Sequence, residues 1–172
     1  MDDLFFFVPG RPQTAGSKTP VTAKNGKSYL IECGSKELRK KKDDWRGDLR
    51  DAALRAIEKA SAGIDALRHE WPKTCALEVY FTFYRARPSG HYGRKSGKPY
   101  VKPSADPYPI QRPDVLKLAR AAEDALTGIL WADDSQIVRE VLEKRWADDT
   151  YGPGLLIRVS VCRHPTENCA AL

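Results

Sequence analysis

The sequence predicts an α+β protein, with elements in the order β, long loop, α, β, basic loop, α, β, β. Apolar residues after residue 114 recur at three- and four-residue spacing, which is the pattern of a helix with one buried face. Apolar and polar residues alternate from 75 to 85, which is the pattern of a half-buried strand. Segments rich in Gly and Pro separate these elements and predict turns and loops.

The composition is typical of a soluble globular protein, with 41% hydrophobic and 30% charged residues. The 172 residues suffice for one core, and we expect a single domain over 1–162 with a flexible tail over 163–172. No stretch is long and apolar enough to span a membrane. The acidic N-terminus with its short apolar run predicts a first strand over 4–8 and not a signal peptide, so we expect a cytoplasmic protein. The net charge of +6 favours an anionic partner.

The four cysteines include no Cys-x-x-Cys pair. In a chain without an export signal they indicate reduced thiols. Cys162, His164 and Cys169 are a possible zinc site, although they lack the paired spacing of zinc ligands. Thiols at a strand end and a loose tail are the favoured alternative.

The first long loop, residues 9–34, carries scattered basic residues and small polar ones. Asn25-Gly26 predicts the turn of a small hairpin within it. A loop of this length either contacts a partner or is merely flexible. Ser35 then suits the N-cap of a long helix that runs to about Ala60. The basic run at 39–42 in this helix predicts either a solvated face or a contact with a phosphate backbone.

The second long loop, residues 85–112, holds seven basic residues against one acidic residue, an excess of +6. Tyr92, Tyr100 and Tyr108 are interleaved with the basic residues. Bases and aromatics on an extended loop suit a nucleic-acid backbone and unstacked bases, whereas a solvated linker is the alternative. The loop leads directly to Asp114, which favours the functional interpretation.

The helix after this loop is expected to begin with Pro113 in its first turn and to end at Gly128 in the left-handed conformation. Leu116 does not fit the pattern, because at 100° per residue it lies away from the apolar face, with Arg120 and Glu123. A polar or charged residue would suit this position better.

Asp133 and Asp134 precede the strand predicted over 137–146. Two aspartates in a turn are usually solvated, but Trp131 before them and Ile137-Val138 after them are expected to anchor the pair in the core. Asp114 lies a helix length, roughly 20 Å, from this turn. The sequence therefore brings Asp114 to Asp134 only if the strand folds back along the helix or a second subunit contributes.

Clustered carboxylates repel one another unless a cation lies between them, and Mg²⁺ is the expected ion because it prefers oxygen ligands. A metal ion beside a cationic loop suggests phosphodiester hydrolysis. Lys117 or Arg120 would stabilise the extra charge of the transition state.

Residues 113–137 resemble the signature of the RusA-type Holliday-junction resolvases, especially their phage-borne relatives: P-D-V-L-K-L-A-R-A-A-E-D-A-L-T-G-I-L-W-A-D-D-S-Q-I. V-P-G-R-P near residue 8 and N-G-K-S-Y near residue 25 are similar to the family in the expected order. The resemblance implies a small mixed sheet packed against two main helices, a homodimer, and Mg²⁺-dependent cutting of four-way DNA junctions. A two-fold dimer suits a junction that needs two symmetric cuts.

By position, the resemblance makes Asp114 and Asp134 catalytic carboxylates. It also makes these two and Asp133 the implied Mg²⁺ ligands. Arg120 occupies the place of a catalytic lysine. The residues expected to bind DNA are Arg11, Lys18, Arg87, Arg94, Lys95, Lys98, Lys102, Arg112 and Lys117.

Leu116 departs from the family pattern, which has its second essential aspartate there. A leucine cannot bind a metal ion, and Glu123 is two turns away, on the order of 10 Å. Arginine at 120 is also not equivalent to lysine. Two hypotheses follow: an active Mg²⁺-dependent endonuclease, or a branched-DNA-binding protein of the same fold with weak or absent cleavage. An unrelated basic binding module is a third.

Overall fold

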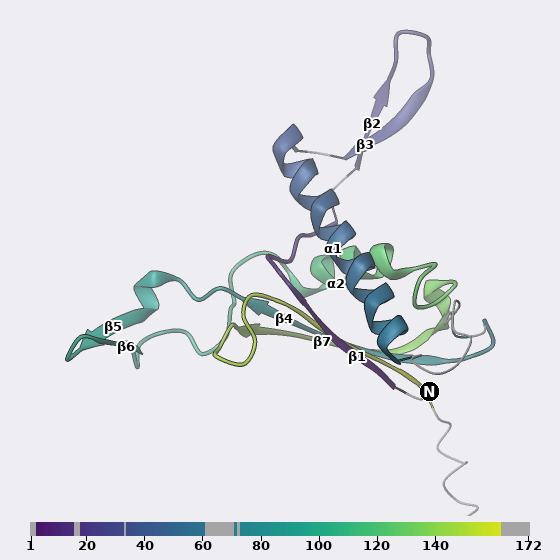
Figure 1. The fold of residues 1–172 in the computed structure, drawn as a ribbon. Coiled ribbons are helices and arrows are strands. Elements are labelled where there is room, and N and C mark those ends of the chain that lie inside the picture. Colours follow the sequence, from purple (N-terminus) through teal and green to yellow (C-terminus); the bar gives the residue numbers. More distant parts are fainter. Residues whose placement is uncertain (1–2, 16–17, 33, 61–70, 72, 163–172) are drawn as a thin grey trace, which may run out of the picture.

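The computed structural model describes residues 3–15, 18–32, 34–60, 71 and 73–162. Figure 1 shows a four-stranded sheet with two helices on one of its sides and two hairpin arms that project away from this body. The predicted α+β class, with two main helices on a small mixed sheet, is confirmed. The C-terminal tail and most of the segment between the first helix and the next strand lie outside the described residues, so the division into domain and tail stays a prediction.

The sheet has the order β1 (Asp3–Pro9), β8 (Gly154–Val161), β4 (Leu77–Arg85) and β7 (Ile137–Trp146). β8 pairs antiparallel with both β1 and β4, whereas β7 pairs parallel with β4. The parallel pair makes the sheet mixed. β7 is an outer strand, with β4 on one side only.

The core lies between the sheet and the helices α1 (Lys36–Ala60) and α2 (Val115–Leu126). The alternation read in β4 is confirmed, because every second residue from 77 to 83 is fully buried. Each such side chain contributes about 1.5–3 kcal/mol of hydrophobic stabilisation. The largest fully buried side chains include Trp131, Phe81, Phe83, Leu49, Leu118 and Leu126.

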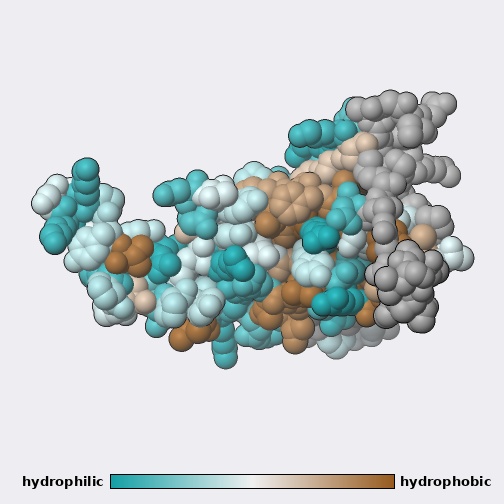
Figure 2. Space-filling view, turned by 90° about the horizontal axis from the view of Figure 1, so that it is seen from below, coloured by the Kyte–Doolittle hydropathy of each residue, from teal (hydrophilic) through white to brown (hydrophobic). Residues whose placement is uncertain are grey.

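Figure 1 shows both helices on one side of the sheet, and Figure 2 shows the molecule from the opposite side. Apolar and charged side chains are mixed there. The rings of Phe7, Tyr84 and Tyr151 contact one another, with centroids 5.0–6.2 Å apart. Arg158 lies over the ring of Tyr80 at 5.5 Å. This ring cluster covers Tyr84, which is only 4% exposed.

The first arm is the hairpin of β2 (Lys18–Thr22) and β3 (Ser28–Glu32), which confirms the hairpin predicted around Asn25-Gly26. Its connection is longer than the two-residue turn that the dipeptide suggested. The backbone N–H of Ala23 donates to the Lys27 carbonyl, and Gly26 adopts a φ of 80° inside this loop.

The second arm is the hairpin of β5 (Tyr92–Lys95) and β6 (Lys98–Val101), where the sequence predicted only an extended loop. Ser96 and Gly97, with φ of 51° and 78°, form its turn. Two consecutive residues with positive φ match the twist of a hairpin. A serine is uncommon in this conformation, which is why the turn was not expected.

The root of the β5–β6 arm packs on Trp146, the last residue of β7. Its indole Nε1 donates to the Asp106 carbonyl at 2.9 Å, and the Arg87 guanidinium lies 5.2 Å from the ring centroid. His91, in the short helix η1 (Ser89–His91), contacts the same ring edge-on. The arm is therefore fixed to the sheet at its base.

Two local expectations are wrong. Pro113 and Asp114 precede α2, which begins at Val115. Val138 is 59% exposed and lies where the pairing of β4 with β7 shifts register, so only Ile137 of the two expected anchors packs against the core. The expected end of α2 is confirmed, because Thr127 is its C-cap and Gly128 follows with a positive φ of 79°. Among the described residues, no helix combines the length and apolarity needed to cross a membrane.

Candidate active site

Asp114 occupies the N-cap position of α2 with extended backbone, φ −67° and ψ 145°. Its side chain makes no capping hydrogen bond and instead pairs with Lys117, Nζ to Oδ2 3.3 Å. Both side chains are more than half exposed. The Asp114 carboxylate is thus presented at the surface, where a ligand can reach it.

Lys144 of β7 supports the turn that carries Asp114. Its Nζ donates to the carbonyls of Gln111 at 3.2 Å and Pro113 at 3.1 Å. Burial and the positive charge of Arg85 lower the pKa of Lys144, whereas the carboxylate of Asp114 opposes this shift. The ammonium group therefore both holds the backbone and faces the carboxylate.

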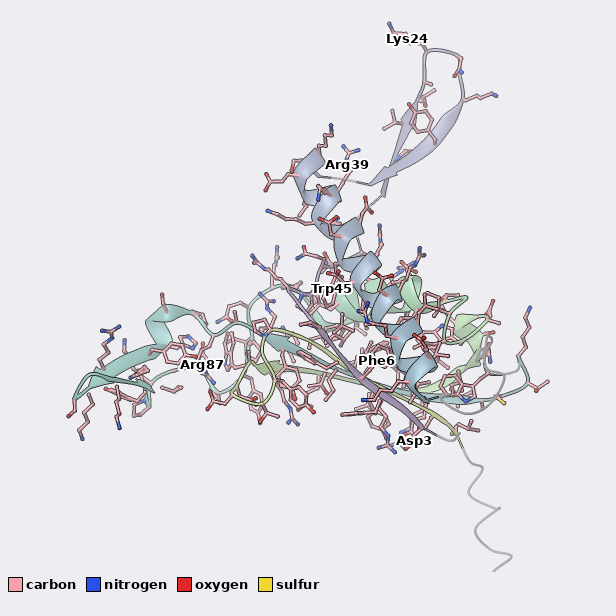
Figure 3. The ribbon with its side chains drawn as sticks, viewed as in Figure 1. Asp3, Phe6, Lys24, Arg39, Trp45 and Arg87 are labelled. Atoms are coloured by element: carbon pink, nitrogen blue, oxygen red, sulfur yellow. The ribbon has the colours of Figure 1, made fainter. Side chains whose placement is uncertain are left out.

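A cavity of about 750 Å³ opens beside Asp114. Its walls come from the segment after β1, from α1, from the end of β4 and from the start of α2. Trp45, which Figure 3 labels on α1, also lines the cavity and is 3% exposed. The charged residues of the wall are Arg11, Lys41, Asp44, Asp48, Arg85, Arg112, Asp114 and Lys117. We call this space the Asp114 cavity.

Asp134 lies beyond the other end of α2, in the short helix η2 (Asp134–Gln136). Thr127 Oγ1 and Trp131 Nε1 both donate to its Oδ1, at 2.5 Å and 2.8 Å. Trp131 is fully buried, so it fixes the carboxylate against the core as the sequence predicted. The second oxygen of Asp134 has no hydrogen bond to a described residue.

Asp133 is the N-cap of η2. Its side chain accepts from the backbone N–H of Ser135 at 2.9 Å, and this hydrogen bonding lowers the pKa of Asp133. The Gln136 side chain accepts from the backbone N–H of Asp133 in return, which completes a capping box. The Asp133 side chain thus stabilises the start of η2.

Glu123 on α2 completes an acidic group near Asp134. Burial raises the pKa of Glu123 to about 8, and the hydrogen bond and charge of Glu140 on β7 add to the shift. The charges of Asp134 and Asp124 act in the same direction. The hydrogen bond between Glu123 and Glu140 therefore favours the protonated form of Glu123. Sequence reasoning missed this pair, because it depends on where β7 lies beside α2.

The two acidic ends of α2 do not meet in one chain. The helix has 12 residues and is about 18 Å long. In the described part of the chain, no three acidic, histidine or cysteine side chains are placed to hold a metal ion together. Asp114 on one side and Asp133 with Asp134 on the other therefore form no complete Mg²⁺ site within a single chain.

The remaining candidate residues are spread over the surface. Leu116 is 69% exposed in the first turn of α2, and Arg120 is exposed one turn further. Arg11, Arg112 and Lys117 line the Asp114 cavity. Lys18 begins the β2–β3 arm, Arg87 lies at the root of the β5–β6 arm, and the other residues expected to bind DNA belong to that second arm: Arg94, Lys95, Lys98 and Lys102. The possible zinc site falls on residues outside the described part, apart from Cys162.

A comparison with protein-family profiles matches residues 36–160 to the family described as Endodeoxyribonuclease RusA. This match covers more than half of the chain. The chain belongs to the RusA endodeoxyribonuclease family. A search of curated proteins finds no match.

The RusA family match includes both helices and the strands β4, β7 and most of β8, and so both ends of α2. At the Asp114 end, sequence reasoning also missed Lys144 and Arg85. A signal for Lys144 was present, since it shares the inward period-two positions of β7 with Leu142. A lysine among such positions usually has a local partner.

Proposed function

We propose that the protein is a structure-specific endodeoxyribonuclease that resolves Holliday junctions or other branched DNA by phosphodiester hydrolysis. The observation that carries this proposal is the Asp114 cavity, in which an exposed carboxylate lies among five basic side chains. Basic groups attract the DNA backbone, and a carboxylate beside a bound phosphate is the arrangement that metal-assisted hydrolysis requires.

The two arms extend the basic surface in two directions. Figure 3 shows Lys24 at the tip of the β2–β3 arm and Arg87 at the root of the β5–β6 arm, with Arg39 on the first turn of α1. Tyr92 and Tyr100 of the second arm are 41% and 45% exposed. Exposed rings among cations suit unstacked bases, which occur where DNA strands branch.

Mg²⁺ is the cofactor that the family resemblance implies. Mg²⁺ is commonly bound by one or two carboxylates together with substrate phosphates and water. Asp114 and a phosphate bound in the cavity would therefore supply part of its ligands. When bound, the ion would polarise the phosphate and activate water. Lys144 would hold Asp114 in place, and Lys117 would neutralise charge beside it.

A homodimer is the proposed assembly. Two symmetric cuts in a junction need two sites related by a two-fold axis. Among the described residues of one chain, no three acidic, histidine or cysteine side chains are placed to hold a metal ion together, which supports this assembly because a second copy can bring its own α2 or η2 close to the first. The outer edge of β7 and the exposed Leu116 and Val138 are available for such contact. Sedimentation at several concentrations measures this assembly.

A branched-DNA-binding protein without cleavage is the second candidate. Leu116 favours it, because its exposed side chain stands two residues from Asp114, where the family has an aspartate. Binding surfaces are unaffected by this replacement, whereas a metal ligand is lost.

A labelled four-way junction separates the two candidates. The full-length protein is incubated with it in Mg²⁺ or in EDTA, and products are resolved on native and denaturing gels. Paired nicks in Mg²⁺ that Asp114→Asn abolishes support the endonuclease. A shifted but uncut junction supports the binding protein, and an unshifted, uncut junction rejects both.

A further inference from the structure

Three arginines from separate segments converge on the Asp114 cavity. Arg11 follows β1, Arg85 ends β4, and Arg112 precedes α2. None of the three forms an ion pair with a residue in the described part of the chain. The other charges of the wall are largely paired: Lys117 with Asp114, Lys41 with Glu37, and Asp44 with Lys40. Among the acidic residues of the wall, only Asp48 lacks an ion pair to a described residue. One unpaired carboxylate therefore stands against three unpaired arginines, and the cavity has an excess of positive charge.

Arg85 is held beside the other positive charges of the cavity by a hydrogen bond and by partial burial. Its NH1 donates to the Arg112 carbonyl at 3.0 Å, and the side chain is partly buried. Burial lowers the pKa of Arg85, and the positive charge of Arg11 lowers it further. A partly buried cation beside another cation is unfavourable, and an anion between them would remove the repulsion.

The backbone around Arg11 is fixed as well. Gly10 has a φ of 135° and lies so close to Trp45 that an added Cβ would be 3.1 Å from the ring. Its N–H donates to the Pro153 carbonyl at 2.9 Å, and the N–H of Ala15 donates to the Lys117 carbonyl at 3.3 Å. These bonds hold residues 11–15 as a wall of the cavity, with Gln13 and Thr14 as neutral polar groups.

We propose that Arg11, Arg85 and Arg112 form a binding site for one backbone phosphate of DNA, adjacent to Asp114. Guanidinium groups suit this ligand because their planar N–H pairs match two phosphate oxygens. The arginines of the cavity are sufficient to infer a phosphate ligand. The assignment of that phosphate to the DNA backbone rests on the proposed function. Bound there, the phosphate would place the neighbouring phosphodiester beside the Asp114 carboxylate.

The test compares Arg85→Gln and Arg11→Gln with Arg55→Gln, an equal loss of charge on an exposed position of α1 outside the cavity. Junction affinity is measured from 50 to 200 mM salt with Asp114→Asn in the background, so that cutting does not interfere. Each cavity variant should weaken binding about 10-fold and reduce the salt slope by about 1, because one phosphate contact is lost. Arg55→Gln should leave the slope unchanged, and equal effects of all three variants would overturn the proposal.

Circular dichroism shows whether Arg85→Gln is folded. Arg85→Lys is a second control, because the lysine keeps the charge and should recover part of the affinity. A junction with single neutral methylphosphonates then locates the contact. One position should weaken the parent protein but leave Arg85→Gln unaffected. Sensitivity of Arg85→Gln at every position would exclude a specific phosphate contact.

Inorganic phosphate distinguishes the two sources of the anion. It should shift the arginine Nε–H resonances of the parent protein but not those of Arg85→Gln, and the junction should displace it. Phosphate that the junction does not displace would exclude the DNA backbone as the ligand. If the parent protein binds no junction, the proposed function fails, and this titration still decides whether the anion site exists.

Discussion

Replacing Glu123 by glutamine should stabilise the protein at high pH and leave it unchanged at low pH. The pKa of Glu123 is raised from an ordinary value of 4.5 to about 8. The carboxyls that face it are Glu140 from β7, Asp134 from η2 and Asp124 on its own helix. Glutamine keeps the size of the side chain and a hydrogen bond to Glu140 but cannot ionise.

The direction in which pH changes the free energy of unfolding follows from proton binding by Glu123. Between pH 4.5 and about 8 the folded chain holds a proton on Glu123 that the unfolded chain has released, so the free energy of unfolding falls as the pH rises. The full difference in pKa would correspond to about 5 kcal/mol, at about 1.36 kcal/mol per pKa unit. Solvent screening at this partly exposed side chain reduces the expected gain of Glu123→Gln to about 1–2 kcal/mol above pH 8.

Urea unfolding followed by tryptophan fluorescence, at pH 4.5 to 9, measures this gain. EDTA is present throughout, because a divalent cation would itself stabilise ionised carboxylates. Glu58→Gln is the matched control, since Glu58 is exposed on α1 and should show no pH-dependent difference. A free energy of unfolding for Glu123→Gln that runs parallel to the parent over the whole range would refute the reasoning.

Four further substitutions test the site and its supports. Leu116→Asp should increase junction cutting in Mg²⁺ without loss of stability, because the side chain is 69% exposed, and unchanged nicking rates would remove the missing-ligand explanation. Lys144→Met should lower the free energy of unfolding by about 1–3 kcal/mol and reduce cutting more than binding, as measured by urea unfolding and single-turnover assays, since it releases the turn before Asp114. Gly10→Ala should cost about 1–3 kcal/mol in the same unfolding assay, because its φ of 135° disfavours a side chain. Tyr100→Ala should weaken junction binding by about 1–3 kcal/mol without affecting thermal unfolding, if its exposed ring stacks on a base.

The parts of the fold that follow from local patterns were predictable from the sequence. The period of two in β4 and the spacing of apolar residues in α2 are direct consequences of which face is buried. The positive φ of Gly128 follows from its place after a helix. The β5–β6 arm was not predictable in this way, because its turn uses a serine in a conformation that serine seldom adopts.

The partners at each end of α2 were not predictable, because they come from the pairing of distant segments. β7 is placed by its parallel pairing with β4, more than fifty residues earlier in the chain. A sequence pattern shows that β7 is a strand but not which residues of α2 it faces. Two contacts depend on how β7 is placed beside α2: Lys144 with the turn before Asp114, and Glu140 with Glu123.

These two contacts explain why the carboxylates stay apart in one chain. Along the helix, Asp114 and Glu123 are nine residues or about 13 Å apart, and along the strand, Lys144 and Glu140 are four residues or about 13 Å apart. Helix and strand therefore run side by side in opposite directions, with a cationic contact at one end and an acidic one at the other. Asp134 accepts a hydrogen bond from Thr127 at the acidic end. It cannot approach Asp114 unless the packing of α2 beside β7 is broken. Within the described part of one chain, Asp133 and Asp134 would therefore not reach a metal ion bound at Asp114.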